Sequence, residues 1–454
     1  MGSATLLSSI NNLSLLNKLV GTQLTPPPDY KALVCILLAG GNDSYNMLVP
    51  RGASEYAEYA ATRSDLALAQ NSLLAINPLT SQGKTFGVHP SMGGVRNLFE
   101  NEKLAFVANV GTLIEPIANS TEYFSGQKQR PLGLYSHSDQ IQQWQTSIPQ
   151  SREAIGWGGR MADLVKTMNT NQGISMNISL SGRNVFQSGN TVLEYSISNQ
   201  GNGVQGITPV VPTWNSESGF LQRLQMGAIK DLSSQIYSNI FQDTFGELTN
   251  QAVDSFEEFE NAISAVQLNT AFSATSLSSN LKMIARVIAA REALGMSRQT
   301  FFVSYGGWDH HDEVLNNQLY MLGVVSNAIN EFQNALAEIG DQEKDTLFTI
   351  SDFARTLTSN GNGSDHAWGG HSIVAGGAVN GKDIYGTYPD LYLTGNPLVV
   401  SNRGNLIPTT SADEFFAEMA LWFGVSPNDL SLVLPNIGNF YNVNGGTPPL
   451  GFLS

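Results

Sequence analysis

Five of the six histidines lie in three short clusters, next to carboxylate or hydroxyl side chains. The clusters occupy residues 136–138 (Ser-His-Ser), 309–312 (Asp-His-His-Asp) and 365–371 (Asp-His-Ala-Trp-Gly-Gly-His). Imidazole nitrogens and carboxylate oxygens together bind divalent ions such as zinc or manganese. The clusters therefore predict a metal site, although the chain has neither a His-Glu-x-x-His motif nor a pair of Cys-x-x-Cys motifs.

The elements expected around these clusters alternate between strands and helices. Apolar runs predict strands at 32–38, 104–110, 299–304, 346–350 and 372–376, and helical spacing predicts helices near 91–101, 138–147, 156–168, 313–338, 411–423 and 427–432. This order is typical of an α/β fold with a mostly parallel central sheet flanked by helices. Such folds place their sites at strand ends, so we expect one pocket there. Its expected residues are Asp43, Asp309, His311, Asp352 and His371.

We expect one large α/β domain over residues 30–440, preceded by an N-terminal extension at 1–29. Two inserts are predicted within the domain. Residues 173–212 alternate polar and apolar side chains, which indicates short antiparallel strands. Residues 215–295 show helical spacing and few aromatic side chains, so we expect helices packed beside the sheet and not a separate core.

Composition limits the classes of partner and compartment. The net charge of −15 argues against nucleic acid and anionic membrane surfaces as partners. No apolar run reaches the length of a membrane span. The single cysteine, Cys35, excludes a disulfide framework and lies in an apolar run, where we expect it in the core. A polar surface with only 13% charged residues suits a periplasmic or secreted protein, although the first residues show no export signal.

Simpler roles also explain several candidate residues. Asp43 after a Gly-Gly turn is typical of an Asx-turn or helix-cap residue, and His89 is typical of a packed loop histidine. Ser136 and Ser138 precede a predicted helix, whose N-terminus would favour an anionic group beside a nucleophile. A helix cap at Ser138 or Asp139 explains the same segment equally well.

Several runs resemble the exported bacterial family called domain of unknown function 1501. They lie at residues 37–50 (Leu-Leu-Ala-Gly-Gly-Asn-Asp-Ser-Tyr-Asn-Met-Leu-Val-Pro), 87–92, 104–111, 135–139, 156–160, 307–311, 349–355 and 362–388. The resemblance covers about residues 31–440 and is weakest over 173–300. Members usually carry a twin-arginine export signal. The family is similar in fold to the alkaline phosphatase and sulfatase superfamily.

The resemblance implies roles for individual residues. Asp43 would be the first-strand metal ligand, and Ser136 the nucleophile with His137 beside it. Asp309 with His311 would form a ligand pair, and His371 would be the late histidine ligand. Asp352 corresponds to the aspartate of an Asp-His pair, in which Phe353 replaces the histidine. The displaced alternative for that pair is Asp365 with His366. Arg355 would clamp a non-bridging ester oxygen.

These implications favour a metal-dependent hydrolase of sulfate or phosphate esters that acts outside the cytoplasm. Its substrate would be a small-molecule or polysaccharide ester, and its metal zinc, manganese or calcium. We expect Asp309 and His371 to hold the ion. The missing Asp-His pair favours an alternative, a non-catalytic sulfatase-like scaffold that binds a metal or polysaccharide. A phosphotransferase of the mutase type is the third possibility.

Overall fold

The computed structural model describes residues 29–80, 82–201, 224, 227–228, 231–235 and 239–454. Most of the predicted extension at 1–29 lies outside the described residues. The end of the predicted β-rich insert and much of the first part of the helical insert also lie outside them.

The central strand is β1 (Lys31–Ala39), which pairs in parallel with β8 (Arg298–Gly306) on one side and β9 (Asp345–Ser351) on the other. The sheet runs in the order β11-β5-β10-β9-β1-β8-β6-β7, and β12 also pairs with β5. The other strands are β5 (Leu104–Gly111), β6 (Asn177–Ser179), β7 (Tyr195–Ser196), β10 (Gly370–Ala375), β11 (Ile384–Tyr385) and β12 (Thr410–Ser411). Only β10 runs antiparallel to its neighbours, so the expected mostly parallel sheet is confirmed.

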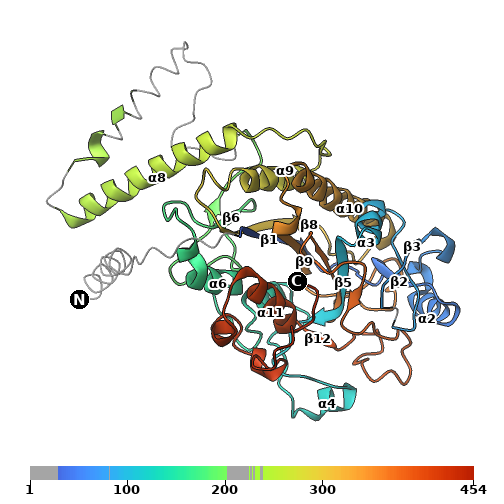
Figure 1. Ribbon diagram of the computed structural model, residues 1–454. Coiled ribbons are helices and arrows are strands. Elements are labelled where there is room, and N and C mark those ends of the chain that lie inside the picture. The colour runs from blue at the N-terminus through green and yellow to red at the C-terminus, as the bar shows by residue number, and fades with distance from the viewer. Residues whose placement is uncertain (1–28, 81, 202–223, 225–226, 229–230, 236–238) are drawn as a thin grey trace.

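Helices cover both faces of this sheet (Figure 1). One face carries α3 (Gly93–Glu100), α9 (Ser276–Ala289) and α10 (Val314–Glu338). The other carries α5 (His137–Thr146), α6 (Trp157–Val165), α11 (Ala412–Phe423) and α12 (Leu430–Val433). Strand β1 contributes Val34 to the first core and Cys35 to the second, because successive side chains of a strand point to opposite faces. Cys35 is buried, as its sequence context predicts.

The small antiparallel sheet lies at a different place from the one predicted. It consists of β2 (Leu48–Pro50), β4 (Phe86–Val88) and β3 (Leu74–Ile76). In the region 173–212, β6 and β7 instead extend the main sheet in parallel with β8. Alternation of polar and apolar residues is the same for both pairing directions, so it does not reveal the direction. The buried Thr300 hydroxyl donates to Asn177 Oδ1 at 2.8 Å, which joins β6 to β8.

In the helical insert, α9 packs against α10 and β8. The long helix α8 (Ile240–Ser264) extends away from the body (Figure 1). Phe259 and Ile263 near its end are buried, whereas Phe241 and Phe245 near its start are exposed. No helix among the described residues is both long enough and apolar enough to cross a membrane.

The remaining elements are short. They are α2 (Ala53–Arg63), α4 (Ser120–Ser125) and the 3-10 helices η1 (Ser64–Leu66), η2 (Gln70–Ser72), η3 (Lys166–Met168), η4 (Gln342–Lys344), η5 (Pro427–Asp429) and η6 (Ile437–Asn439). Neither α2 nor α4 is expected from the sequence reasoning above, and both bear on the site and its surroundings.

Candidate metal centre

Three parallel strands end at one edge of the sheet, and the antiparallel β10 begins there. Asp309 follows β8 and Asp352 follows β9, while the loop that enters β10 brings Asp365 and His366 to the same edge. Gly40, just after β1, has φ +123°, and a Cβ there would lie 2.6 Å from the backbone nitrogen of Asp309. The glycine therefore permits the close approach of the loops that carry the site.

Three imidazoles converge on Asp309. Its Oδ2 lies 3.5 Å from His137 Nε2, and its Oδ1 lies 3.1 Å from His311 Nε2 and 3.5 Å from His366 Nε2. One ligand atom each from His137, Asp309 and His366 lies within 4.8 Å of the others. His137 was expected as a catalytic residue, and its position also makes it a candidate metal ligand.

The outer nitrogen of His137 is held by Asp352. His137 Nδ1 lies 2.7 Å from Asp352 Oδ2, while Asp352 Oδ1 accepts a hydrogen bond from Gly40 N at 3.0 Å. Burial raises the pKa of Asp352, and the hydrogen bonds from Gly40 and His137 oppose that rise. A carboxylate behind an imidazole directs the other ring nitrogen toward a metal. Asp352 thus orients His137, in place of the direct ligation expected from the sequence.

The other two imidazoles are held in the same way. His311 Nδ1 lies 3.1 Å from Asp365 Oδ1, and His366 Nδ1 lies 2.8 Å from the carbonyl oxygen of Tyr135. Tyr135 has φ +74°, a conformation that is rare for a non-glycine residue and that sets the direction of this carbonyl. A carbonyl oxygen only accepts, so His366 carries its proton on Nδ1 and its Nε2 is a bare lone pair when the ring is neutral. Burial lowers the pKa of His366, and positive neighbours lower it further, which favours that neutral ring.

The donor set fits a divalent ion. His311 Nε2 and His366 Nε2 lie only 2.9 Å apart, and in neutral rings both are bare because both Nδ1 atoms face acceptors. Two lone pairs at that distance repel unless a proton or a metal ion lies between them. Three imidazole nitrogens and one carboxylate oxygen are the ligands of a tetrahedral zinc or related transition-metal site. Calcium instead prefers six to eight oxygen ligands.

Arg355 supports the site from the interior. Its side chain is fully buried and lies 2.5 Å from Asp309 Oδ1, and it also donates to the carbonyls of Gly40, Gly41, Trp308 and Ser364. Burial raises the pKa of Asp309, but the hydrogen bond and charge of Arg355 outweigh this and hold that pKa below its ordinary value. The predicted substrate clamp is therefore wrong for this conformation, because the loop carbonyls and Asp309 occupy the guanidinium.

Asp43 lies in the interior in an ion pair with Arg63, the last residue of α2. Both side chains are fully buried, and Arg63 also donates to the carbonyl of Thr356 at 3.1 Å. None of the contacts of Asp43 reaches the three converging imidazoles. An arginine thus supplies the positive charge that the sequence reasoning assigned to a metal.

His371 is also separate from the converging imidazoles. Its Nδ1 accepts a hydrogen bond from Asn109 N at 3.1 Å, and its ring stacks on Tyr388 and meets Tyr45 edge-on. Burial lowers its pKa to about 3, so the ring is neutral. The expectation that His371 joins Asp309 in one ligand shell is not met, because Tyr45 and Tyr388 pack on its ring in the core.

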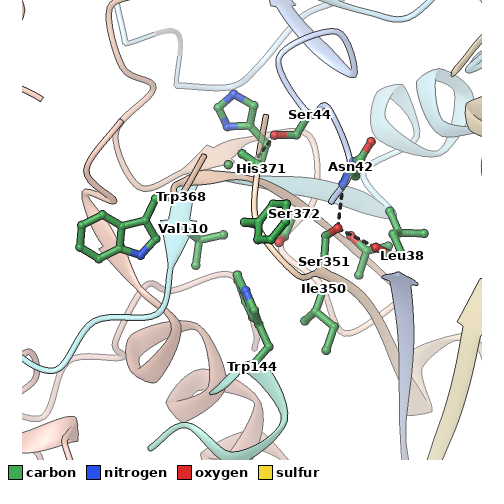
Figure 2. A pocket seen from close by; sticks show the side chains of 14 residues that line it. Leu38, Asn42, Ser44, Val110, Trp144, Ile350, Ser351, Trp368, His371 and Ser372 are labelled. Atoms are coloured by element: carbon green, nitrogen blue, oxygen red, sulfur yellow. Dashed lines mark hydrogen bonds between the residues drawn. The ribbon is translucent and has the colours of Figure 1, made fainter. Parts of the chain in front are cut away.

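His371 contributes to the lining of a cavity of about 20 Å³, which is room for a single water molecule (Figure 2). In the wall, Ser351 Oγ accepts from Asn42 N at 2.8 Å and donates to the Leu38 carbonyl at 2.6 Å. The cavity is far too small for an ester substrate.

Ser136 is the N-cap of α5, and its Oγ accepts from the backbone nitrogen of Asp139. The cap predicted for this helix thus exists, but at Ser136 and not at Ser138 or Asp139. Ser136 Oγ also lies 3.2 Å from Ser138 Oγ.

Phe353 stands where the resemblance implies a histidine. Its ring packs against the rings of His366 and His137, with centroids 4.4 and 4.8 Å away.

Sequence reasoning missed the roles of Arg63, Phe353 and the Tyr135 carbonyl. The run 53–63 (Ala-Ser-Glu-Tyr-Ala-Glu-Tyr-Ala-Ala-Thr-Arg) is rich in good helix formers, a signal that would have identified α2. A backbone carbonyl leaves no such signal, because any residue type supplies one.

Solved structures with a similar chain path include several proteins of low sequence identity. One is Ps i-CgsB in complex with k-i-k-neocarrahexaose, with 9% identity, 90% of this chain and 77% of that chain covered, and a TM-score of 0.34. Another is the lipoteichoic acid synthase LtaP from Listeria monocytogenes, with 8% identity, 85% and 79% coverage, and a TM-score of 0.31. A third is the soluble domain of lipooligosaccharide phosphoethanolamine transferase A from Neisseria meningitidis, with 9% identity, 90% and 89% coverage, and a TM-score of 0.30. At these identities and scores the matches assign no activity to this chain.

No curated protein sequence matches the chain. A family model does match it, over residues 30–404, and that range includes all the residues of the candidate metal centre described above. The match confirms the resemblance seen in the sequence runs. The chain belongs to the family described as protein of unknown function (DUF1501).

Proposed function

We propose that the protein hydrolyses sulfate or phosphate esters with a divalent metal ion held by His137, Asp309, His311 and His366. The observation that carries the proposal is the arrangement of three imidazoles, each with its Nδ1 on a protein acceptor and its Nε2 directed at Asp309. Such an arrangement prepares lone pairs for a cation before the cation binds.

Zinc fits the donor set best, with manganese as the next choice. When bound, such an ion polarises an ester oxygen and lowers the pKa of water. The side chains of Asp309 and His311 are 49% and 45% exposed, so a substrate can reach the centre from solvent. The ion pair with buried Arg355 holds the Asp309 carboxylate in position and lowers its pKa.

Ser136 is the proposed nucleophile because it directly precedes His137 at the N-terminus of α5, where the helix end favours a developing anion. Its capping bond to Asp139 N fixes the side chain at that helix end. Attack by Ser136 Oγ on sulfur or phosphorus would break the bond to the alcohol oxygen, and the serine proton would leave with the alcohol. Water would then attack the sulfated or phosphorylated serine, which releases the acid and returns a proton to Ser136 Oγ.

A non-catalytic scaffold remains the second candidate, and specific contacts favour it. Arg355 is occupied by loop carbonyls, Asp43 is paired with Arg63, and Phe353 stands where the resemblance implies a histidine ligand. In that case the same imidazoles would bind metal for structure alone.

The substrate proposed is a small-molecule or polysaccharide ester outside the cytoplasm. The acidic net charge of −15 and the surface of few charged residues support an exported protein that does not bind nucleic acid.

The deciding experiment measures metal content and turnover on the same zinc-loaded preparation, with 4-nitrophenyl sulfate and 4-nitrophenyl phosphate as probes. We expect turnover of one of them, a loss of at least a hundredfold in Ser136→Ala with metal retained, and loss of both metal and turnover in His137→Ala. Bound metal with no turnover of either ester would favour the scaffold. Turnover that survives in Ser136→Ala would exclude the serine as nucleophile.

A further inference from the structure

An aromatic and cationic patch lies on the segment between β5 and α5. Phe124 is 67% exposed on α4 and meets the buried Tyr123 edge-on at 5.0 Å. The guanidinium carbon of Arg130 lies 4.9 Å from the centre of the same Tyr123 ring. Phe124 and Arg130 therefore both contact Tyr123, and both are exposed to solvent.

This patch is connected to the metal centre through one residue. The side chain of Tyr135 interacts with Tyr123 and with Asn405, and the charge of Arg130 reaches it. The backbone carbonyl of the same Tyr135 accepts from His366, and Asn405 donates to the His366 carbonyl at 3.0 Å. Tyr123 and Tyr135 therefore link the patch to the centre.

Arg130 differs from the cations around it. Lys128 pairs with Glu115 at 3.1 Å, Arg152 with Asp139 at 2.7 Å, and Arg403 with Asp365 at 2.7 Å. Within the described part of the chain, no carboxylate pairs with Arg130, whose ring contact is with Tyr123. An exposed cation that lacks a counter-ion in a chain of net charge −15 has its positive charge available to a ligand.

We propose that Phe124 and Arg130, supported by Tyr123, form a subsite for an anionic sugar unit of a polysaccharide substrate. The exposed Phe124 ring offers an apolar surface for the C–H face of a sugar, and Arg130 offers a planar fork for a sulfate or carboxylate. The subsite proposal rests on the proposed function at one point, because the proposed function places the cleaved ester at the metal centre. The proposal goes further because such a subsite would favour polysaccharides with repeated negative charges over small isolated esters.

The test compares binding of three probes to the zinc-loaded full chain by calorimetry in 0.15 M salt. The probes are a galactan hexasaccharide with one sulfate on each sugar, the same hexasaccharide without sulfate, and a hexapeptide of glutamate. We expect Arg130→Gln to weaken binding of the sulfated hexasaccharide about tenfold and Phe124→Ala to weaken it about threefold. Turnover of 4-nitrophenyl sulfate, which carries no sugar unit for the subsite, stays unchanged in both variants.

Two matched controls make the result specific. Arg152→Gln removes an exposed charge that Asp139 already neutralises, and Leu79→Ala removes an apolar side chain of 68% exposure. Each should change binding of the sulfated hexasaccharide less than twofold. An equal loss of affinity for the sulfated hexasaccharide in Arg152→Gln and Arg130→Gln would overturn the proposal. The loss would then reflect the net charge of the protein and not a specific site.

Unchanged binding in Arg130→Gln would also overturn the subsite, and so would a glutamate peptide that binds as tightly as the sulfated sugar. If the wild-type protein turns over no ester but Arg130→Gln still loses sugar binding selectively, the hydrolase proposal fails while the subsite stands. Ester turnover thus tests the hydrolase proposal, and sugar binding separately tests the subsite.

Discussion

The Nε2 atoms of His311 and His366 lie 2.9 Å apart, and the Nδ1 atom of each ring is held by a protein acceptor, Asp365 and the Tyr135 carbonyl respectively. Neutral rings held in this way direct two lone pairs at each other beside the Asp309 carboxylate. Such a contact needs a cation or an added proton for stability. The outer hydrogen bonds of the two rings thus prepare the candidate metal centre for a cation.

The first prediction is that the protein binds about one zinc or manganese ion per chain and that His366→Gln and Asp309→Asn each lose it. Each change removes one of the proposed ligands, so affinity falls steeply. Elemental analysis after dialysis measures the loss. Asp312→Asn is the control, because this neighbouring carboxylate contacts Asn362 and not the imidazoles. Metal retained in both ligand variants would contradict the assignment.

The second prediction concerns the carboxylate behind His137. In Asp352→Asn the amide can still accept from Gly40, but it no longer offers a charged acceptor to His137 Nδ1. The preferred tautomer of His137 then changes, and its Nε2 lone pair is lost part of the time. We expect metal affinity to fall by about 10-fold to 100-fold, measured by competition with a chelator. A folded Asp352→Asn protein with wild-type affinity would show that Asp352 has no orienting role.

The sequence predicted the position of the centre better than its ligand set. Strand β1 is a continuous apolar run, and β8 and β9 have short apolar stretches at their centres, so the strand pattern placed Asp309, Asp352 and the 365–371 cluster at one edge. The antiparallel direction of β10, which returns the 365–371 loop to that edge, comes from pairing with β5 and β9. Local sequence carries no information on that pairing.

Two ligand predictions depended on tertiary contacts of the side chains concerned. The ring of His371 packs between Tyr45 and Tyr388, and Asp43 pairs with Arg63 across the loop after β1. Charge and hydrogen-bonding type made both residues plausible ligands, but burial decided otherwise. Burial of a polar side chain is set by tertiary packing, which a single sequence does not show.

The third prediction is that Arg63→Met destabilises the fold by about 3 to 5 kcal/mol, because it leaves Asp43 buried and unpaired. The double change Asp43→Asn with Arg63→Met should recover part of that loss, since no buried charge then remains. Urea denaturation of the single and double variants measures the coupling. Purely additive losses would show that the pair does not interact energetically.

The last prediction concerns pH and a residue far from the metal centre. Asp413, in the first turn of α11, is fully buried, and burial raises its pKa to about 8, although Ser147 and the charge of Arg160 oppose the rise. In the unfolded chain the same carboxyl has its ordinary pKa of 3.8. Between these two values the folded state holds a proton that the unfolded state has released.

Stability therefore falls as pH rises through that window, by up to about 1.4 kcal/mol per pH unit from this group. Asp413→Asn removes the titration while keeping a neutral side chain of similar shape. We expect wild type to lose more stability than Asp413→Asn between pH 5 and pH 8, with the two close together at pH 4. Parallel stability curves over that range would mean that Asp413 is already ionised in the folded protein, held so by Arg160.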